Sequence, residues 1–161
     1  MRMRTFGRTG WPVSEIGYGL WGMGGWTGSD DQESLRALER AMALGCTFFD
    51  TAWVYGLGKS ETLLGEALRS RKGTGGVGTG LREGAGGDLS PQSAPSPLIV
   101  ATKIPPKNMK WPARADCPVY EAYPADNIRE YTEKSLQNLG VPTIDLQQFH
   151  DWSEAWAADT G

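Results

Sequence analysis

Blocks of hydrophobic and polar positions alternate along this chain, and they predict strands and helices in turn. A weak apolar run at 13–19 ends in glycines, and the turn residues at 7–10 before it predict a small hairpin with residues 3–6. Three further apolar runs have the length of buried strands. They occupy residues 46–50, 98–103 and 144–150.

Between these runs, three segments carry apolar residues at helical spacing. They cover residues 30–44, 60–70 and 124–139. Asp30 and Glu33 have capping-box spacing at the start of the first helix, and Gly45 follows its end, where a left-handed residue is common. Pro124 suits the first helical position of the third helix, and Gly140 is placed to end it.

The resulting order of strand, helix, strand, helix, strand, helix, strand predicts a parallel sheet with crossover helices. This α/β pattern suits either a doubly wound sheet or part of a (β/α) barrel. Two segments interrupt it. Residues 72–97 are rich in Gly, Ser and Pro and are expected to form a disordered insertion. Residues 104–123 form a long loop directly after the third strand, a place where loops are often functional.

The composition fits one globular domain over residues 1–161 and excludes several classes of function. Hydrophobic residues make up 39% of the chain and charged residues 22%. The net charge of -3, without a basic stripe, argues against nucleic acid as a partner, because phosphate binding needs clustered Lys and Arg. No apolar run approaches the roughly 20 residues that cross a bilayer. The two cysteines lack metal-site spacing, so we expect no metal and a cytoplasmic protein.

Four reactive side chains follow the predicted strands at their carboxyl ends. Asp50 ends the second strand, and Tyr55 lies just beyond it. Lys103 ends the third strand, and His150, the only histidine, ends the fourth. Taken singly, each has an ordinary explanation as a packing, solvated or hydrogen-bonded structural residue. Because the carboxyl ends of parallel strands meet at one edge of the array, their joint placement favours a catalytic site.

This set of side chains suits a reaction in which an oxygen gains a proton while the adjacent carbon gains a hydride. A tyrosine phenol has a pKa of about 10 and is a poor acid at neutral pH, but a neighbouring lysine cation lowers that pKa. A carboxylate holds the lysine charged and in place, and an imidazole can hydrogen-bond a substrate carbonyl. No side chain supplies a hydride, so the chemistry requires a cofactor.

The motifs around these residues resemble those of the aldo-keto reductase family. The segment 49–56 (Phe-Asp-Thr-Ala-Trp-Val-Tyr-Gly) resembles the family signature. Further matches in family order are residues 13–19, 60–61, 64–65, 101–103, 135–140 and 144–150. The resemblance implies the N-terminal half of a (β/α)8 TIM barrel, truncated to about the first four β/α units and preceded by a small β-hairpin. It covers nearly all of the chain outside the insertion.

The same resemblance implies an activity and assigns roles in it. The reaction implied is reduction of an aldehyde or ketone to an alcohol by an oxidoreductase. By that resemblance Tyr55 is the general acid, while Lys103 and Asp50 tune it. His150 then orients the carbonyl of the substrate. The partner expected is therefore a small-molecule carbonyl compound, with no nucleic acid or membrane involved.

The cofactor that the resemblance implies is NADPH, bound in an extended form across the mouth of the barrel. Gly19, Leu20 and Trp21 belong to the loop after the first strand and would lie near the nicotinamide or the substrate. Asp50 would border the same cofactor site. Ser60 and Glu61 are expected to cap the second helix, with a secondary role near the cofactor.

A second interpretation is a catalytically inactive half-barrel that acts only through association with another chain. Four strands cannot close a barrel, so the first and last strands would present open edges and apolar faces. Self-association or a complementing C-terminal half would cover them. The role of the tryptophans between residues 111 and 156 also stays open, because they could line a substrate pocket or anchor loops.

Overall fold

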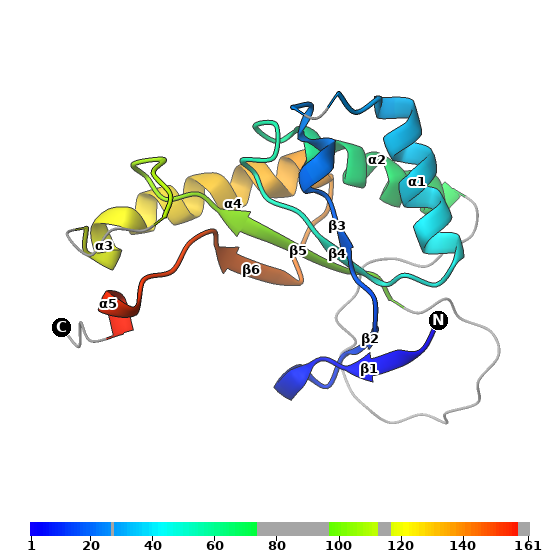
Figure 1. The fold of residues 1–161 in the computed structure, drawn as a ribbon, viewed down its shortest axis with the longest axis horizontal. Helices are drawn as coiled ribbons and strands as arrows, with labels where there is room; N and C mark the ends of the chain where they lie inside the picture. The colour runs from blue at the N-terminus through cyan, green and yellow to red at the C-terminus, as the bar shows by residue number, and fades with distance from the viewer. Residues whose placement is uncertain (27, 74–96, 113–116, 158–161) are drawn as a thin grey trace.

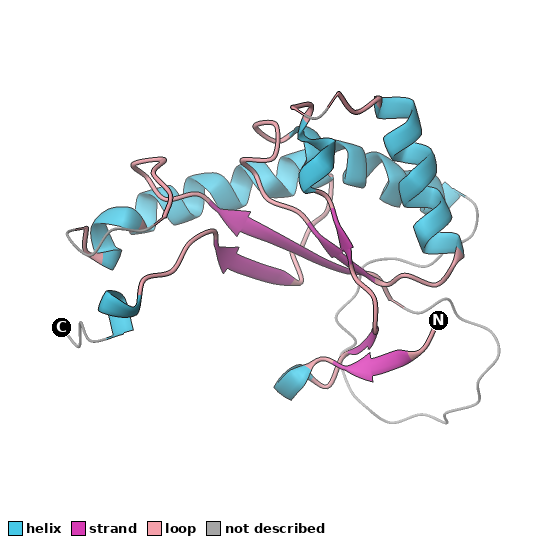
Figure 2. Ribbon diagram, in the orientation of Figure 1, coloured by secondary structure: helices cyan, strands magenta, loops and turns pink. Residues whose placement is uncertain are grey.

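A four-stranded parallel sheet organises the chain, and the long helices all lie on one of its faces (Figures 1 and 2). The computed structural model describes residues 1–26, 28–73, 97–112 and 117–157. The strands occur in sequence order and are β3 (Tyr18–Gly19), β4 (Phe48–Asp50), β5 (Ile99–Ile104) and β6 (Leu146–Phe149). Each neighbouring pair is parallel, as strand–helix–strand crossovers require, which confirms the predicted α/β alternation.

Three long helices fill the crossovers. They are α1 (Asp31–Ala43), α2 (Lys59–Gly73) and α4 (Ala125–Leu139). The Asp30 carboxylate accepts a hydrogen bond from the backbone N–H of Glu33 at 2.8 Å, which confirms the predicted cap. Gly45 and Gly140 both have positive φ, at 87° and 63°, and end their helices as predicted. Pro124 has extended backbone and is the N-cap of α4, one position earlier than predicted.

The N-terminal hairpin is separate from the sheet. Its strands β1 (Met3–Thr5) and β2 (Pro12–Ser14) pair antiparallel across the short 3₁₀ helix η1 (Gly7–Thr9). The ring of Phe6 packs against that of Phe48 with 5.2 Å between the centroids, which ties the hairpin to the start of β4.

The single strand predicted over 13–19 is wrong in its extent, because the structure divides this run between two sheets. Val13 and Ser14 belong to the hairpin, whereas Tyr18 and Gly19 pair with β4. Between them, Glu15 turns back toward the hairpin, and its backbone N–H donates to the Arg2 carbonyl at 3.0 Å. The apolar pattern is the same in both parts, so it does not reveal the change of partner.

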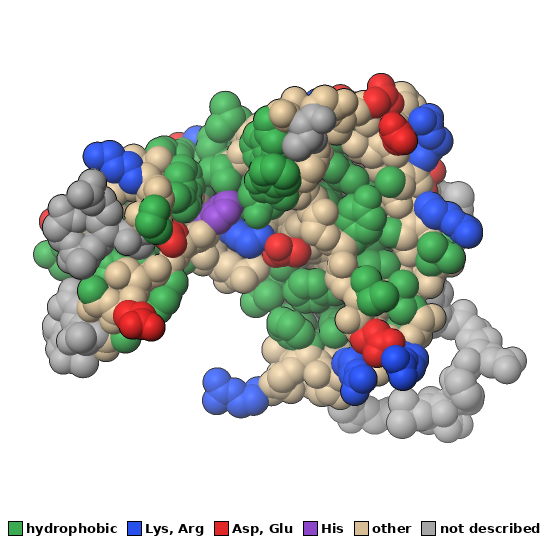
Figure 3. All heavy atoms as spheres, viewed as in Figure 1, with side chains coloured by type: hydrophobic (Ala, Val, Ile, Leu, Met, Phe, Trp, Pro, Cys, Tyr) green, Lys and Arg blue, Asp and Glu red, His purple; other side chains and the backbone are tan. Residues whose placement is uncertain are grey.

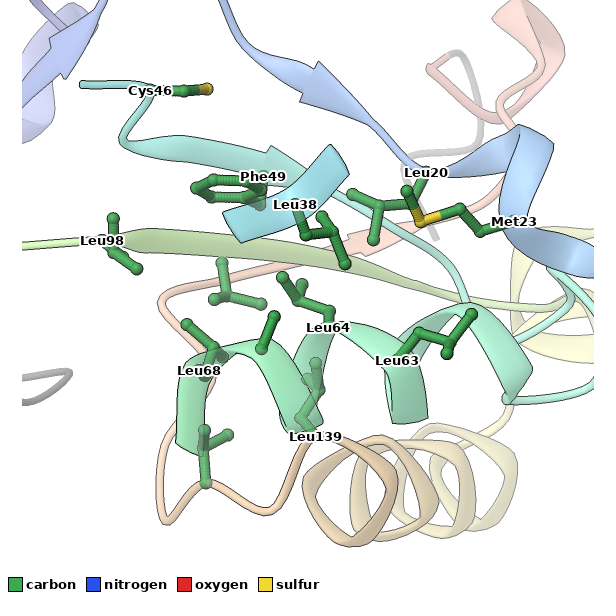
Figure 4. Close-up of a cluster of buried hydrophobic side chains, with 13 residues drawn as sticks. Leu20, Met23, Leu38, Cys46, Phe49, Leu63, Leu64, Leu68, Leu98 and Leu139 are labelled. Carbon is green, nitrogen blue, oxygen red and sulfur yellow. The ribbon is translucent and has the colours of Figure 1, made fainter. Parts of the chain in front are cut away.

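The main core lies between the sheet and the helices (Figure 4). Leu38 of α1, Leu64 of α2 and Leu139 at the end of α4 are completely buried. Figure 4 shows Leu38 and Leu64 close to Phe49 of β4, with Leu20 on the same side of the sheet. Burying each such side chain contributes about 1.5–3 kcal/mol, so this cluster fixes the strands that end at the site.

A smaller core anchors the segments after β5 and β6. It consists of Ile104, Ala122, Tyr123, Tyr131 and Trp156. The segment after β5, predicted as a loop over 104–123, contains the short helix α3 (Val119–Ala122), and α5 (Glu154–Ala157) lies beside it. Trp156 is 7% exposed, so this tryptophan anchors the loop region.

Most of the segment 72–97, residues 74–96, lies outside the described residues, as Figure 1 indicates. Within the described residues, no helix is long and apolar enough to span a membrane. The same residues contain no group of His, Cys, Asp and Glu side chains arranged to hold a metal ion.

Candidate active site

Asp50 ends β4, and Lys103 is the second-last residue of the neighbouring strand β5. Their side chains form an ion pair on the face of the sheet away from the long helices. The Nζ atom of Lys103 donates to both Asp50 carboxylate oxygens at 2.8 Å. It also donates to the backbone carbonyl of Thr51 at 2.8 Å. The Lys103 side chain is 15% exposed and that of Asp50 is 37% exposed. Three fixed acceptors therefore hold the ammonium group in one place.

Tyr55 lies in the turn after β4, next to this ammonium group. The Nζ atom of Lys103 is 5.2 Å from the centroid of the Tyr55 ring, within the range of a cation–π contact. The following residue, Gly56, has a φ of 70°, and a Cβ atom there would lie 2.4 Å from the carbonyl oxygen of Gly24. Only glycine fits this close approach, which packs the tyrosine turn against the loop after β3.

His150 completes the cluster from the end of β6. Its ring meets the Tyr55 ring edge to face, with 5.4 Å between the centroids. Its backbone N–H donates to the Ile104 carbonyl at 2.9 Å, which continues the ladder beyond β6. Burial, together with the nearby Lys103 cation, lowers the pKa of His150 below its usual 6.5, which favours the neutral imidazole. Its Nδ1 atom is buried and has no hydrogen-bond partner in the described part of the chain.

Three further residues contact the cluster. The Trp26 ring stands at 90° to the Tyr55 ring, with 6.1 Å between the centroids. The centroids of the Trp111 and His150 rings are 5.8 Å apart. Trp111, one of the tryptophans whose role the sequence did not decide, therefore lies at the site. The amide of Gln148 donates to the Asp50 carboxylate at 3.5 Å. Gln148 lies two positions before His150, so the alternation of side chains along a strand places both on the same face of the sheet. This spacing could have identified Gln148 as a site residue from the sequence.

The residues predicted to bind a cofactor separate into two groups. Gly19 is exposed, and its register partner in β4 is Asp50. Trp21 is 58% exposed, and its ring packs against that of Trp26 at 5.5 Å. Leu20, by contrast, is completely buried in the main core, and its backbone N–H donates to the Asp50 carbonyl at 2.9 Å. Its side chain therefore points away from the site and holds the loop in place.

The site lies open on the molecular surface. Figure 3 shows the single histidine beside a basic and an acidic side chain, with hydrophobic side chains adjoining them. This arrangement places a phenol, an ammonium group and a neutral imidazole around one accessible region. Such a set can donate a proton to an oxygen and can stabilise the negative charge that remains on the phenol.

The predicted capping role of Ser60 and Glu61 is not what their side chains show. Both residues are completely buried. The Ser60 hydroxyl forms a hydrogen bond with the Thr51 hydroxyl, and the Glu61 carboxylate accepts from the Thr102 hydroxyl at 2.6 Å. These bonds join α2 to the strand ends, because the first turn of the helix faces the sheet and not solvent.

Comparison with known proteins places this geometry in a family. The model of the aldo/keto reductase family matches residues 15–160. The chain belongs to the aldo/keto reductase family. Among its relatives, the aldo-keto reductase YhdN of Bacillus subtilis is 38% identical over 152 residues, an alignment that covers 93% of this chain and 38% of YhdN.

Solved aldo-keto reductases share the fold. The holo form of an aldo-keto reductase from Bacillus halodurans matches with a TM-score of 0.65 and 24% identity, covering 99% of this chain and 42% of that one. An aldo-keto reductase from Klebsiella pneumoniae in complex with NADPH matches with a TM-score of 0.56 and 20% identity, covering 92% and 39%. The chain thus spans about two fifths of the length of these relatives. The predicted family and TIM-barrel lineage are confirmed.

Proposed function

We propose that this site reduces an aldehyde or ketone to an alcohol, with NADPH as the hydride donor. One observation supports the proposal above all others: Lys103 of β5 and His150 after β6 both contact the ring of Tyr55, which follows β4. This convergence brings together the groups needed to protonate a carbonyl oxygen. Membership of the aldo/keto reductase family supports the same reaction.

Tyr55 donates its phenol proton to the carbonyl oxygen of the substrate. The phenolate that remains is stabilised by the ammonium group of Lys103, 5.2 Å from the ring centroid. Asp50 and the Thr51 carbonyl hold that ammonium group through three hydrogen bonds of 2.8 Å. The cation is therefore preorganised for the charge that develops on the tyrosine.

His150 orients the carbonyl. Its lowered pKa favours the neutral imidazole, in which one ring nitrogen carries a proton and the other does not. The protonated nitrogen donates a hydrogen bond to the substrate oxygen without adding a second positive charge beside Lys103. Trp26 and Trp111, which contact Tyr55 and His150, border the oxygen-binding position.

The described residues fit the reacting end of a nicotinamide cofactor. Gly19 is exposed at the end of β3 beside Asp50, and Trp21 is exposed two residues later. Outside its chain neighbours, no atom would lie within 4 Å of a Cβ at Gly19. We assign cofactor contacts to these three residues and leave out Leu20, whose side chain is in the core. When bound, the cofactor supplies the hydride that the carbonyl carbon receives. NADPH is the choice because a relative with this fold was solved in complex with it.

A second proposal is association through the open face of the sheet, by self-association or with a complementing C-terminal half. Two features of the described residues favour it. The long helices cover one face only, whereas parallel sheets are usually covered on both. The end strands β3 and β6 each pair with a single neighbour. Sedimentation of the purified chain over a range of concentrations tests self-association, and a monomer at every concentration would contradict it.

The reductase proposal is tested by cofactor binding and turnover of the purified chain. NADPH is titrated against tryptophan fluorescence, and consumption of NADPH is followed with a panel of aldehydes and ketones. Tyr55→Phe should retain cofactor binding and lower kcat by about 10²–10⁴-fold, because it removes the proton donor. Tyr120→Phe is the matched control, since Tyr120 is 65% exposed in α3.

The two measurements test separately the role of the Tyr55 phenol and the ability of this chain to bind NADPH. A Tyr55→Phe variant that reduces carbonyls as fast as the wild type would contradict the role of the phenol. A wild-type chain that fails to bind NADPH at millimolar concentration would exclude activity of these 161 residues by themselves. Membership of the family would be unaffected by that result.

A further inference from the structure

Behind the ion pair, on the side of the sheet that faces the helices, lies a chain of buried polar groups. Thr51, Ser60, Glu61 and Thr102 are all completely buried. The Glu61 carboxylate accepts from the Thr102 hydroxyl at 2.6 Å and, through its other oxygen, from the Asn138 amide at 2.8 Å. One glutamate at the start of α2 therefore joins β5 to α4.

The alternation of side chains along a strand connects this network to the site. Thr102 and Lys103 are adjacent in β5, so their side chains lie on opposite faces of the same backbone. Thr102 is fixed to α2, while Lys103 carries the ammonium group on the other face. A displacement of the backbone at Thr102 would move Lys103 directly.

The second anchor acts on an acceptor of that ammonium group. The Thr51 hydroxyl is bonded to Ser60, and the Thr51 carbonyl accepts from Nζ of Lys103 at 2.8 Å. The backbone N–H of Thr51 donates to the Ala101 carbonyl at 2.9 Å. The strand that carries Lys103 and the Thr51 carbonyl that accepts from it are therefore both bonded, through Thr102 and Thr51, to the first turn of α2.

Burying a carboxylate is expensive, and well-packed apolar side chains of similar size commonly give equal or greater stability. Hydrogen bonds differ from apolar contacts because they fix direction as well as distance. Two of the three side-chain hydrogen bonds of this network involve Thr51 and Thr102, the residues next to Asp50 and Lys103 in the sequence. These hydrogen bonds therefore contribute more to the orientation of the strand ends than to the stability of the fold.

We propose that Glu61 is a positioning residue for the reaction. Through Thr102 it fixes the end of β5, so that the Lys103 ammonium group stays on Asp50 and beside Tyr55. Ser60 supports the same contact by holding Thr51. The proposal rests on the proposed reductase function for its kinetic consequence, but the placement of Lys103 can be measured without turnover.

The measurement is the rate at which Lys103 is methylated by limiting formaldehyde and a hydride reagent, read by mass spectrometry relative to Lys107. Lys107 is 54% exposed and serves as the internal reference. Thr102→Val removes the hydroxyl with little change of shape, and Glu61→Met removes its partner. Each should raise the relative labelling rate of Lys103 roughly five-fold, the factor that corresponds to one lost hydrogen bond.

A matched control separates positioning from general loss of stability. Thr47 forms a buried pair with Ser14, in which each backbone N–H donates to the other's hydroxyl, at 2.8 and 2.9 Å. Thr47→Val therefore removes a comparable buried hydroxyl at the amino end of β4, away from the carboxyl ends of the strands where the site lies. Thr102→Ser should restore the slow labelling of Lys103. The double variant Glu61→Met/Thr102→Val should label no faster than Glu61→Met, because that single variant has already lost the bond between Glu61 and Thr102.

Kinetics provide the second measurement. Thr102→Val should lower kcat roughly five-fold while KM for the carbonyl substrate changes less than about two-fold, because the lost bond acts on proton transfer and not on binding. A wild-type chain without turnover would contradict the reductase proposal. The labelling result would then decide by itself whether Glu61 positions Lys103. Labelling of Lys103 in Thr102→Val and Glu61→Met no faster than in Thr47→Val would overturn the positioning role.

Discussion

Gly65 lies where α2 meets the end of α4, and a single methyl group at this position has a predictable cost. A Cβ atom there would be 2.4 Å from the carbonyl oxygen of Leu139 and 2.8 Å from that of Asn138. Both oxygens belong to the backbone, so no rotation of a side chain relieves the clash. The helices would have to separate by about 1 Å to restore ordinary contact, which loosens the core around Leu64 and Leu68.

Two effects of opposite sign act on Gly65→Ala. In an unconstrained helix interior, alanine is favoured over glycine by about 1 kcal/mol, because glycine loses more conformational entropy on folding. Overpacking a filled interface costs about 1–3 kcal/mol, and backbone atoms place this site at the upper end. We therefore expect a net loss of about 1–2 kcal/mol, which lowers Tm by about 2–8 °C in a chain of this size.

Urea unfolding followed by tryptophan fluorescence and circular dichroism measures this loss. The midpoint for Gly65→Ala should fall while the slope of the transition stays unchanged. Gly22→Ala is the control, because nothing lies within 4 Å of a Cβ at Gly22. That control should stay within about 0.5 kcal/mol of the wild type. A Gly65→Ala variant as stable as the wild type, or more stable, would refute the close contact between α2 and α4.

Two further predictions concern titration. The single histidine gives one imidazole signal, and its NMR midpoint should lie below 6.5, because burial and the Lys103 cation lower the pKa of His150. Lys103→Met should raise that midpoint, and a wild-type value at or above 6.5 would contradict the described site. The stability linked to His150 is then complete above about pH 6.5 and is lost as pH falls through the lower folded-state pKa. Burial raises the pKa of Tyr123 to about 12, so its contribution is complete below about pH 10 and is lost as pH rises toward 12. Unfolding free energies over that range should fall more steeply in the wild type than in Tyr123→Phe, and parallel curves would show that the phenol is not buried.

Local features of the fold could be predicted from the sequence because they depend on neighbouring residues. The cap at Asp30 and the stops at Gly45 and Gly140 follow from backbone geometry within one turn of each helix. The division of residues 13–19 between the hairpin and the sheet could not be predicted, since pairing with either partner requires the same apolar pattern. The choice between them depends on where β4 lies, which is a long-range property of the sheet.

By itself, the sequence determined which reactive residues follow the strands, because Asp50, Lys103 and His150 each end an apolar run. The tertiary structure alone decided which side chains meet. It placed Gln148 on Asp50, turned Leu20 into the core, and brought Glu61 to the back of β5. These contacts join residues tens of positions apart, and strand register together with helix packing sets their distances. The pattern of apolar and polar residues along the chain specifies neither the strand register nor the helix packing.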